Sequence, residues 1–191
     1  MNLQSSKSLT GAALETISIS SKESMPEPRR PDLSRFVEIY REGDLLFFSY
    51  ERGMLDEIGL RFREKEMRWL IKSRLKRLGP LQDVTVPHGF AMKCGPQFSE
   101  RLPALFQEID KSLVAMARRP LTPPMIEEAL DITVHERLRW TKERRLPISG
   151  HASFRKGQKI VVVTYPVDEI SDLMRTPEII AVWRASDRIS R

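Results

Sequence analysis

The pattern of apolar and polar positions divides the chain into three stretches. Residues 1–31 are polar and rich in serine, and they end in the run Met25-Pro26-Glu27-Pro28-Arg29-Arg30-Pro31. Because proline fixes φ and lacks a backbone N–H, three prolines in six residues disfavour both helix and central strand. We therefore predict a flexible N-terminal tail over residues 1–31, an α+β region over 32–119 and a second unit over 120–191.

Region 32–119 begins with a short apolar, aromatic run at residues 45–50, which predicts a buried strand. Residues 55–78 carry apolar side chains at three- and four-residue steps and predict one long helix. Residues 81–94 contain proline and glycine interruptions, so we expect strand and loop there. Residues 103–118 predict a second amphipathic helix, and the break at Arg119-Pro120 marks the boundary between the two units.

Two similar start signals follow the break. Thr122 with Pro123, and then Thr133, stand where a helix N-cap and first turn would be, so two short helices joined by a tight turn are expected. The run from Ile160 to Val163 is the strongest strand signal of the chain. The predicted elements are a short helix that starts at Pro123 and ends before Ile132, and a helix over 134–143. They are followed by a hairpin formed by 152–154 and 159–165, and by helices over 167–174 and from 176 or 177 to 185.

Leu130 to Pro147, with Trp140 and a closing Leu146-Pro147 pair, resembles the first half of the MerR-type and excisionase-type winged helix-turn-helix. The aromatic residue that follows the wing in that family has its match in Tyr165, before an acidic helix. The resemblance covers about 54 of the 191 residues, from Leu121 to Met174. The chain departs from the family in having Arg137 at a usually apolar position and Arg144 where glycine is common.

The resemblance implies an α+β fold, mainly helical, with a C-terminal winged helix-turn-helix that binds double-stranded DNA. We expect Arg139 and Lys142 to point outward into the major groove, opposite Leu138 and Trp140 in the core. Arg155 and Lys156 are expected at the turn of the wing. The candidate DNA-binding residues are Thr133, His135, Glu136, Arg139, Lys142, Arg144, Arg145, Arg155, Lys156, Lys159 and Tyr165.

Charge supports a nucleic-acid partner. The chain has a formal net charge of +6, and residues 133–160 alone hold eight basic and two acidic residues, which is also +6. Residues 61–77 repeat this balance on a predicted helix. For each stretch the alternative is a solvated basic surface. In the second stretch the residues that would make a further nucleic-acid contact are Arg61, Arg68, Lys72, Arg74 and Lys76.

The sequence shows no clear signal for an enzyme, a metal-binding protein or a membrane protein. The single cysteine, Cys94, excludes an intramolecular disulfide and fits a reducing, cytoplasmic setting. Its nearest histidine is His88, but an inert thiol is the simpler interpretation. We find no metal-ligand spacing, phosphate-binding loop or nucleophile motif, and no apolar run long enough to span a membrane. We therefore expect no enzyme activity, no cofactor, no metal and no membrane partner.

The interpretation that we favour is a sequence-specific DNA-binding protein, either a transcriptional regulator or an accessory factor in recombination or replication. Its partners would be double-stranded DNA, other DNA-bound proteins and a second copy of the chain. An interaction or scaffold protein that uses the C-terminal unit for protein contacts is the alternative function. A ribbon-helix-helix that starts at residues 159–165 is the alternative fold.

Overall fold

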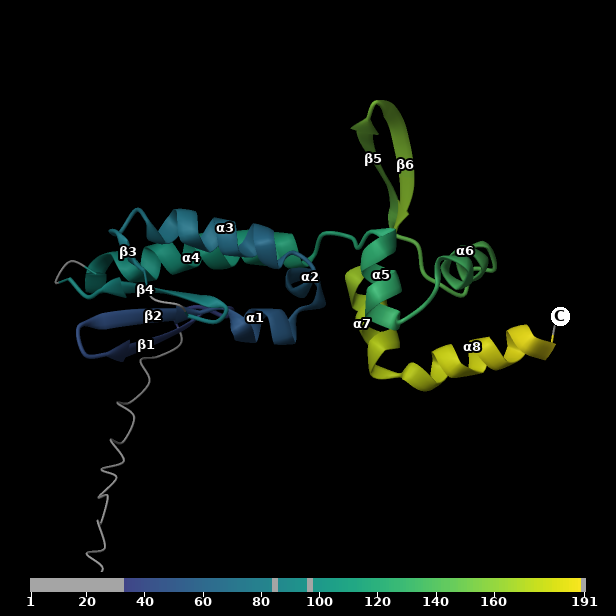
Figure 1. Ribbon diagram of the computed structural model, residues 1–191, viewed down its shortest axis with the longest axis horizontal. Coiled ribbons are helices and arrows are strands. Elements are labelled where there is room, and N and C mark those ends of the chain that lie inside the picture. The colour runs from purple at the N-terminus through teal and green to yellow at the C-terminus, as the bar shows by residue number, and fades with distance from the viewer. Residues whose placement is uncertain (1–32, 84–85, 96–97, 190–191) are drawn as a thin grey trace, which may run out of the picture.

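The computed structural model describes residues 33–83, 86–95 and 98–189, without the side chains of Ser99, Phe154, Lys156 and Gln158. The predicted tail over 1–31 lies outside these residues. The chain has an α+β fold with many helices and two small antiparallel sheets, as the sequence predicted. In Figure 1 the sheet of β1–β4 lies with α1–α4 on one side of the molecule, and a separate hairpin lies with α5–α8 on the other.

The first sheet has the strand order β1-β2-β4-β3, and its neighbouring strands are antiparallel. The predicted strand is confirmed as β2 (Leu45–Ser49). It pairs with β1 (Glu38–Glu42) on one side and with β4 (Gly89–Lys93) on the other, and β3 (Leu81–Gln82) pairs with β4. We did not predict β1. Four of its five residues are charged or aromatic and largely exposed, so its apolar pattern is weak.

Two helices, α3 (Glu64–Leu75) and α4 (Phe98–Ala117), cover one face of this sheet (Figure 1). The first core lies between them and the strands. It includes the fully buried side chains of Phe48, Met92, Ile71, Phe106 and Ile109. The apolar sides of α3 and α4 thus pack against the sheet.

The prediction of a single helix over residues 55–78 is wrong. The structure has three helices instead, α1 (Glu51–Asp56), α2 (Ile58–Arg61) and α3, with an extended residue at Glu57 and a non-helical Arg63. The break allows α2 to turn away from the axis of α3.

Long-range contacts at α2 explain this break. Gly59 meets the end of α4 so closely that a Cβ on it would lie 2.0 Å from the carbonyl oxygen of Ala117. The buried guanidinium of Arg63 donates to the carbonyls of Gly59 at 2.8 Å, Arg119 at 3.0 Å and Pro120 at 2.7 Å. The break thus accompanies the placement of Arg63 beside the carbonyls of Arg119 and Pro120, which would otherwise lose this donor, and buried carbonyls without donors are costly.

The C-terminal helices match their predicted positions. They are α5 (Pro123–Leu130), α6 (Val134–Lys142), α7 (Val167–Arg175) and α8 (Pro177–Ile189), the last extending four residues beyond the predicted end. Asp131 turns the chain between α5 and α6 with a left-handed φ of 50°. The hairpin is β5 (Gly150–Lys156) and β6 (Gln158–Thr164), and Gly157 occupies its turn with φ 76°.

A second core holds these helices together. Its buried residues include Leu121, Ile126, Trp140, Tyr165 and Ile170. Leu121 and Tyr165 also form a backbone bridge, with N–H···O distances of 2.8 and 3.0 Å, that ties the start of the unit to the foot of the hairpin.

The two cores meet at α2. Ile58 is 9% exposed and belongs to the second core, with Phe62 packed against the same cluster, although both precede α3 in the chain. The sequence boundary at Arg119-Pro120 therefore does not separate all of the packing.

Candidate nucleic-acid interface

The start of α6 is held by a reciprocal cap. The Thr133 hydroxyl accepts from the Glu136 backbone N–H at 3.1 Å, and a Glu136 carboxylate oxygen accepts from the Thr133 N–H at 2.8 Å. Arg184 on α8 donates to the other oxygen of Glu136 at 2.8 Å. Hydrogen bonding from Arg184, helped by Thr133 and opposed by burial, lowers the pKa of Glu136 to about 2.

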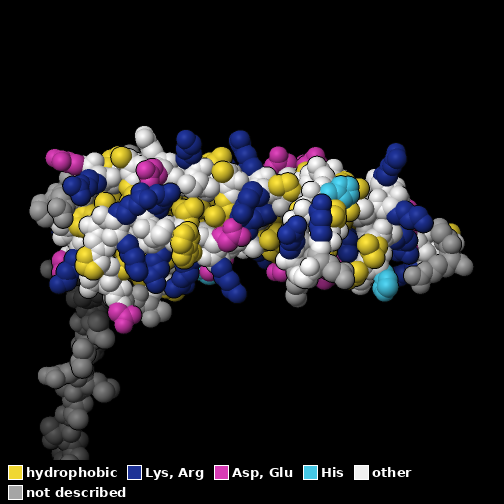
Figure 2. Space-filling model, turned by 90° about the horizontal axis from the view of Figure 1, so that it is seen from above, with side chains coloured by type: hydrophobic (Ala, Val, Ile, Leu, Met, Phe, Trp, Pro, Cys, Tyr) yellow, Lys and Arg dark blue, Asp and Glu magenta, His cyan; other side chains and the backbone are white. Residues whose placement is uncertain are grey.

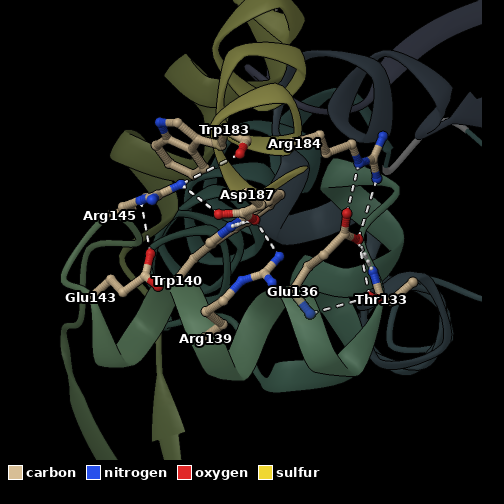
Figure 3. Close-up of polar contacts among 9 residues, drawn as sticks. All are labelled: Thr133, Glu136, Arg139, Trp140, Glu143, Arg145, Trp183, Arg184 and Asp187. Carbon is tan, nitrogen blue, oxygen red and sulfur yellow. Dashed lines mark hydrogen bonds and ion pairs between the residues drawn. The ribbon is translucent and has the colours of Figure 1, made fainter. Parts of the chain in front are cut away.

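One side of α6 is covered by α8, and the Asp187 carboxylate of α8 makes several of the contacts between them (Figure 3). Asp187 is buried and accepts from the indole N–H of Trp140 at 2.9 Å and from Arg145 at 3.1 Å. It also forms an ion pair with Arg139. Trp140 is fully buried, as predicted, and stands edge-on to Trp183 with ring centroids 5.1 Å apart.

These contacts correct part of the expected reading face. Arg139 was expected to point outward, but its side chain is only 33% exposed because the buried carboxylate of Asp187 draws it towards α8. Arg145 is held in the same way, with Glu143 as a second partner at 2.9 Å. Glu136 faces Arg184 and its own cap, so its carboxylate points away from the outward side of α6.

A second side of α6 faces Tyr165, which we had expected to be a phosphate ligand. Tyr165 is fully buried, and its hydroxyl lies 3.0 Å from that of Thr141 and 3.3 Å from the guanidinium of Arg137. Arg137 also bonds Glu127 at 2.6 Å, which explains how an arginine occupies this usually apolar position. A phosphate contact by Tyr165 is therefore excluded in this conformation.

The outward side of α6 consists of Val134, His135, Leu138 and Lys142, at spacings that place them on one face. Leu138 was expected in the core, but it is 54% exposed and Val134 is 50% exposed. The register is thus one position away from the prediction, because Arg137 rather than Leu138 faces inward.

Arg144 follows α6 and is exposed, with a left-handed φ of 60°. This is the position at which the resembled family often has glycine, the residue best suited to that backbone. The departure noted in the sequence therefore leaves the turn intact but places an arginine in a strained conformation.

The hairpin projects from the body of the molecule (Figure 1). Arg155 and Lys159 are directly opposite each other near its free end, and both are exposed. Directly opposed residues share one face of a two-stranded ribbon, so two positive charges lie side by side there. The turn itself is predicted correctly, whereas the Lys156 side chain lies outside the described residues.

In the second basic stretch, residues 61–77, some of the candidate residues contact other side chains and others are exposed. Arg74 contacts Glu108 at 3.2 Å, and Arg68 lies over the ring of Phe90, 5.6 Å from its centroid. The remaining residues, Arg61, Lys72 and Lys76, are exposed. Sequence reasoning missed Trp69, which stands 72% exposed among them, because an aromatic at helical spacing is normally a core residue.

The candidate chemistry of Cys94 and His88 is not assembled. His88 lies 3.1 Å from Glu64, and Cys94 is half-buried beside the first core. Within residues 33–83, 86–95 and 98–189, no group of three or more His, Cys, Asp and Glu side chains is arranged to hold a metal ion.

Comparisons with protein-family models, with curated proteins and with solved structures found no match. No helix in the described part of the chain has the length and hydropathy needed to cross a membrane. What the chain binds therefore has to be inferred from its own side chains and their placement.

Proposed function

We propose that residues 120–189 form a winged helix-turn-helix that binds double-stranded DNA, with α6 reading the major groove and the β5–β6 hairpin serving as the wing. The protein would act as a transcriptional regulator or as an accessory factor in recombination or replication. The observation that carries this proposal is the opposed Arg155–Lys159 pair near the free end of the hairpin. Like charges directly opposite each other destabilise a hairpin, and a phosphate group would relieve that repulsion.

The unpaired cations of the unit support the same conclusion. Lys142, Arg144, Arg155 and Lys159 are exposed and, within the described residues, form no ion pair, whereas Arg137, Arg139 and Arg145 each have a carboxylate partner. Cations without a carboxylate partner remain available to phosphates, and releasing the counterions of DNA favours such contacts.

The outward side of α6 suits base reading as well as charge. Lys142 can donate to the O6 and N7 atoms of guanine, and the exposed methyl groups of Val134 and Leu138 match the methyl group of thymine. The cap at Thr133 and the ion pairs to α8 hold this helix in one orientation, which sequence-specific contacts require.

The decisive experiment is selection of bound duplexes from a random pool with the full-length protein, followed by fluorescence anisotropy on the recovered and a scrambled duplex. A recovered motif would show specificity, and its symmetry would show whether one or two copies bind. We expect Lys142→Ala to cost roughly 1–3 kcal/mol on the recovered duplex and much less on the scrambled one.

The double variant Arg155→Gln/Lys159→Gln should weaken both duplexes alike and reduce the slope of log affinity against log salt by about two. Lys93→Gln/Lys111→Gln removes two exposed lysines far from the hairpin and is the matched control. An unchanged salt slope in the hairpin variant, or a pool with no enriched motif, would contradict the proposal.

Protein contact by the same unit is the second candidate, and the exposed Val134 and Leu138 favour it. An apolar patch on an outward helix face is also typical of a protein interface. In that case Leu138→Ala would abolish partner binding, salt would have little effect, and the hairpin variant would bind the partner normally.

A further inference from the structure

The outer side of α3 carries a row of lysines around an exposed tryptophan. Lys65, Trp69, Lys72 and Lys76 follow one another at steps of four, three and four residues, which places them on one side of the helix. The three lysines are exposed, and Trp69 is 72% exposed. Figure 2 looks onto this side of the molecule, where Lys and Arg side chains are spread over the left half with hydrophobic ones between them.

The protein leaves the charge of this row uncompensated. Two nearby carboxylates are engaged elsewhere, Glu66 with Arg119 and Glu108 with Arg74 and Arg77, whereas Asp83 lies near Lys72 and Lys76 without forming an ion pair with them. Within the described residues Lys65, Lys72 and Lys76 form no ion pair. Lys65 and Lys76 are eleven positions apart, so the row extends about 16 Å at a helical rise of 1.5 Å per residue. Its length and charge suit an extended polyanion.

An apolar hollow adjoins the tryptophan. Its volume is about 480 Å³, and it is lined by Lys65, Glu66, Trp69, Leu70 and Met116. A second, separate hollow of about 690 Å³ lies beside Lys72 and Lys76, with Asp83 as its acidic lining residue. A flat ring beside an apolar hollow and flanked by ammonium groups offers one surface for a base and another for phosphates.

We propose that this side of α3, defined by Lys65, Trp69, Lys72 and Lys76, binds single-stranded nucleic acid. A base stacks on Trp69, and the lysines contact the phosphates on either side. A duplex fits less well, because both faces of each internal base are already stacked on neighbours. An anionic membrane also fits less well, because the apolar residues of α3, among them Met67, Ile71 and Leu75, are buried in the core and leave no apolar face to insert.

The test uses the full-length protein and a fluorescent oligothymidylate of about 15 nucleotides, long enough for one such site. We expect binding by anisotropy, accompanied by quenching of tryptophan emission that disappears in Trp69→Phe. Trp69→Ala should lower the affinity about tenfold, whereas Trp69→Phe should retain most of it. An oligouridylate of the same length shows whether RNA or DNA is preferred.

A second experiment tests the charge of the row with a triple variant in which Lys65, Lys72 and Lys76 are all replaced by glutamine. At about 0.7 per phosphate contact, the salt slope should fall by about two. The matched control replaces three other exposed cations, Lys93, Arg101 and Lys111, and should leave the slope unchanged.

The results separate this site from the proposed duplex interface. Arg155→Gln/Lys159→Gln should leave oligothymidylate binding intact, and Trp69→Ala should leave binding to the selected duplex intact. The proposal fails if Trp69→Ala and the triple lysine variant bind the oligonucleotide as the wild type does. It also fails if Trp69→Ala weakens duplex binding equally, or if the protein binds vesicles of phosphatidylserine and phosphatidylcholine but no oligonucleotide.

Discussion

Replacing Glu136 with glutamine tests how α6 is held in place. Its carboxylate closes the cap on Thr133 and receives the Arg184 guanidinium from α8. Glutamine can still accept the backbone hydrogen bond of a capping box, so the variant removes mainly the charge. The side chain is 16% exposed, while that of Arg184 is 38% exposed.

The pKa of Glu136 gives the magnitude. A fall from the ordinary 4.5 to about 2 corresponds to roughly 3 kcal/mol in favour of the folded state at neutral pH. Solvent screens the more exposed Arg184, so we expect the substitution to lower the free energy of unfolding by on the order of 2 kcal/mol at pH 7.

The pH dependence has a definite sign. The unfolded chain binds a proton at Glu136 near pH 4.5, whereas the folded chain does so only near pH 2. The stabilisation is therefore complete above about pH 5 and is lost as the pH falls towards 2. Wild type and Glu136→Gln should differ most at neutral pH and converge in acid.

The assay is urea unfolding between about pH 7 and pH 2.5, followed by tryptophan fluorescence in a Trp69→Phe background, which leaves Trp140 and Trp183 of the second core as reporters. Glu128→Gln on α5, an exposed carboxylate with no ion pair in the described structure, is the matched control. A Glu136→Gln deficit that stays constant from neutral to acid pH would refute the assignment of its pKa to this contact.

Three further substitutions address the second core and its edge. Arg144→Gly should raise the free energy of unfolding by about 1 kcal/mol, because glycine adopts the left-handed φ of 60° without strain, and it should weaken duplex binding. Urea unfolding and anisotropy measure the two effects, and a variant in which stability and duplex affinity both rise or both fall would contradict this. Asp187→Ala leaves the buried indole N–H of Trp140 without an acceptor and should cost about 3 kcal/mol in urea unfolding, with Asp187→Asn losing less because its amide oxygen still accepts. Ile58→Ala should lower the free energy of unfolding by about 2 kcal/mol, because Ile58 is buried in the second core. Leu55→Ala is the control, since Leu55 is 79% exposed and its loss should change the free energy of unfolding by less than about 0.5 kcal/mol.

The sequence predicted best those elements whose signals lie within a few residues of one another. The Thr-Pro start of α5, the N-cap of α6 at Thr133 and the valine run of β6 are local features, and α5, α6 and β6 begin within a residue of the expected positions. Local backbone preferences act over such short distances and remain visible without knowledge of the fold.

The features that sequence reasoning missed depend on contacts between distant residues. The break after α2 exists because Arg63 reaches the carbonyls at 119 and 120, which are more than fifty positions away. The inward turn of Arg139 likewise depends on Asp187, which lies 48 residues further along the chain. Neither partner has a local pattern that would mark it, so the face of α6 could be predicted only to within one position.

Long-range contacts also determine which basic residues are free on the surface, and this could not be predicted from the sequence. A count over residues 133–160 treats all eight basic residues alike, yet Arg137, Arg139 and Arg145 are part of the packing. The planar guanidinium can serve several acceptors at once, which suits it to half-buried ion pairs between helices. Each such pair removes a cation from the surface and at the same time fixes the orientation of α6. The cations left on the outward side of α6 and on the hairpin then determine which face can meet a polyanion, and substitutions there should alter binding while leaving the fold intact.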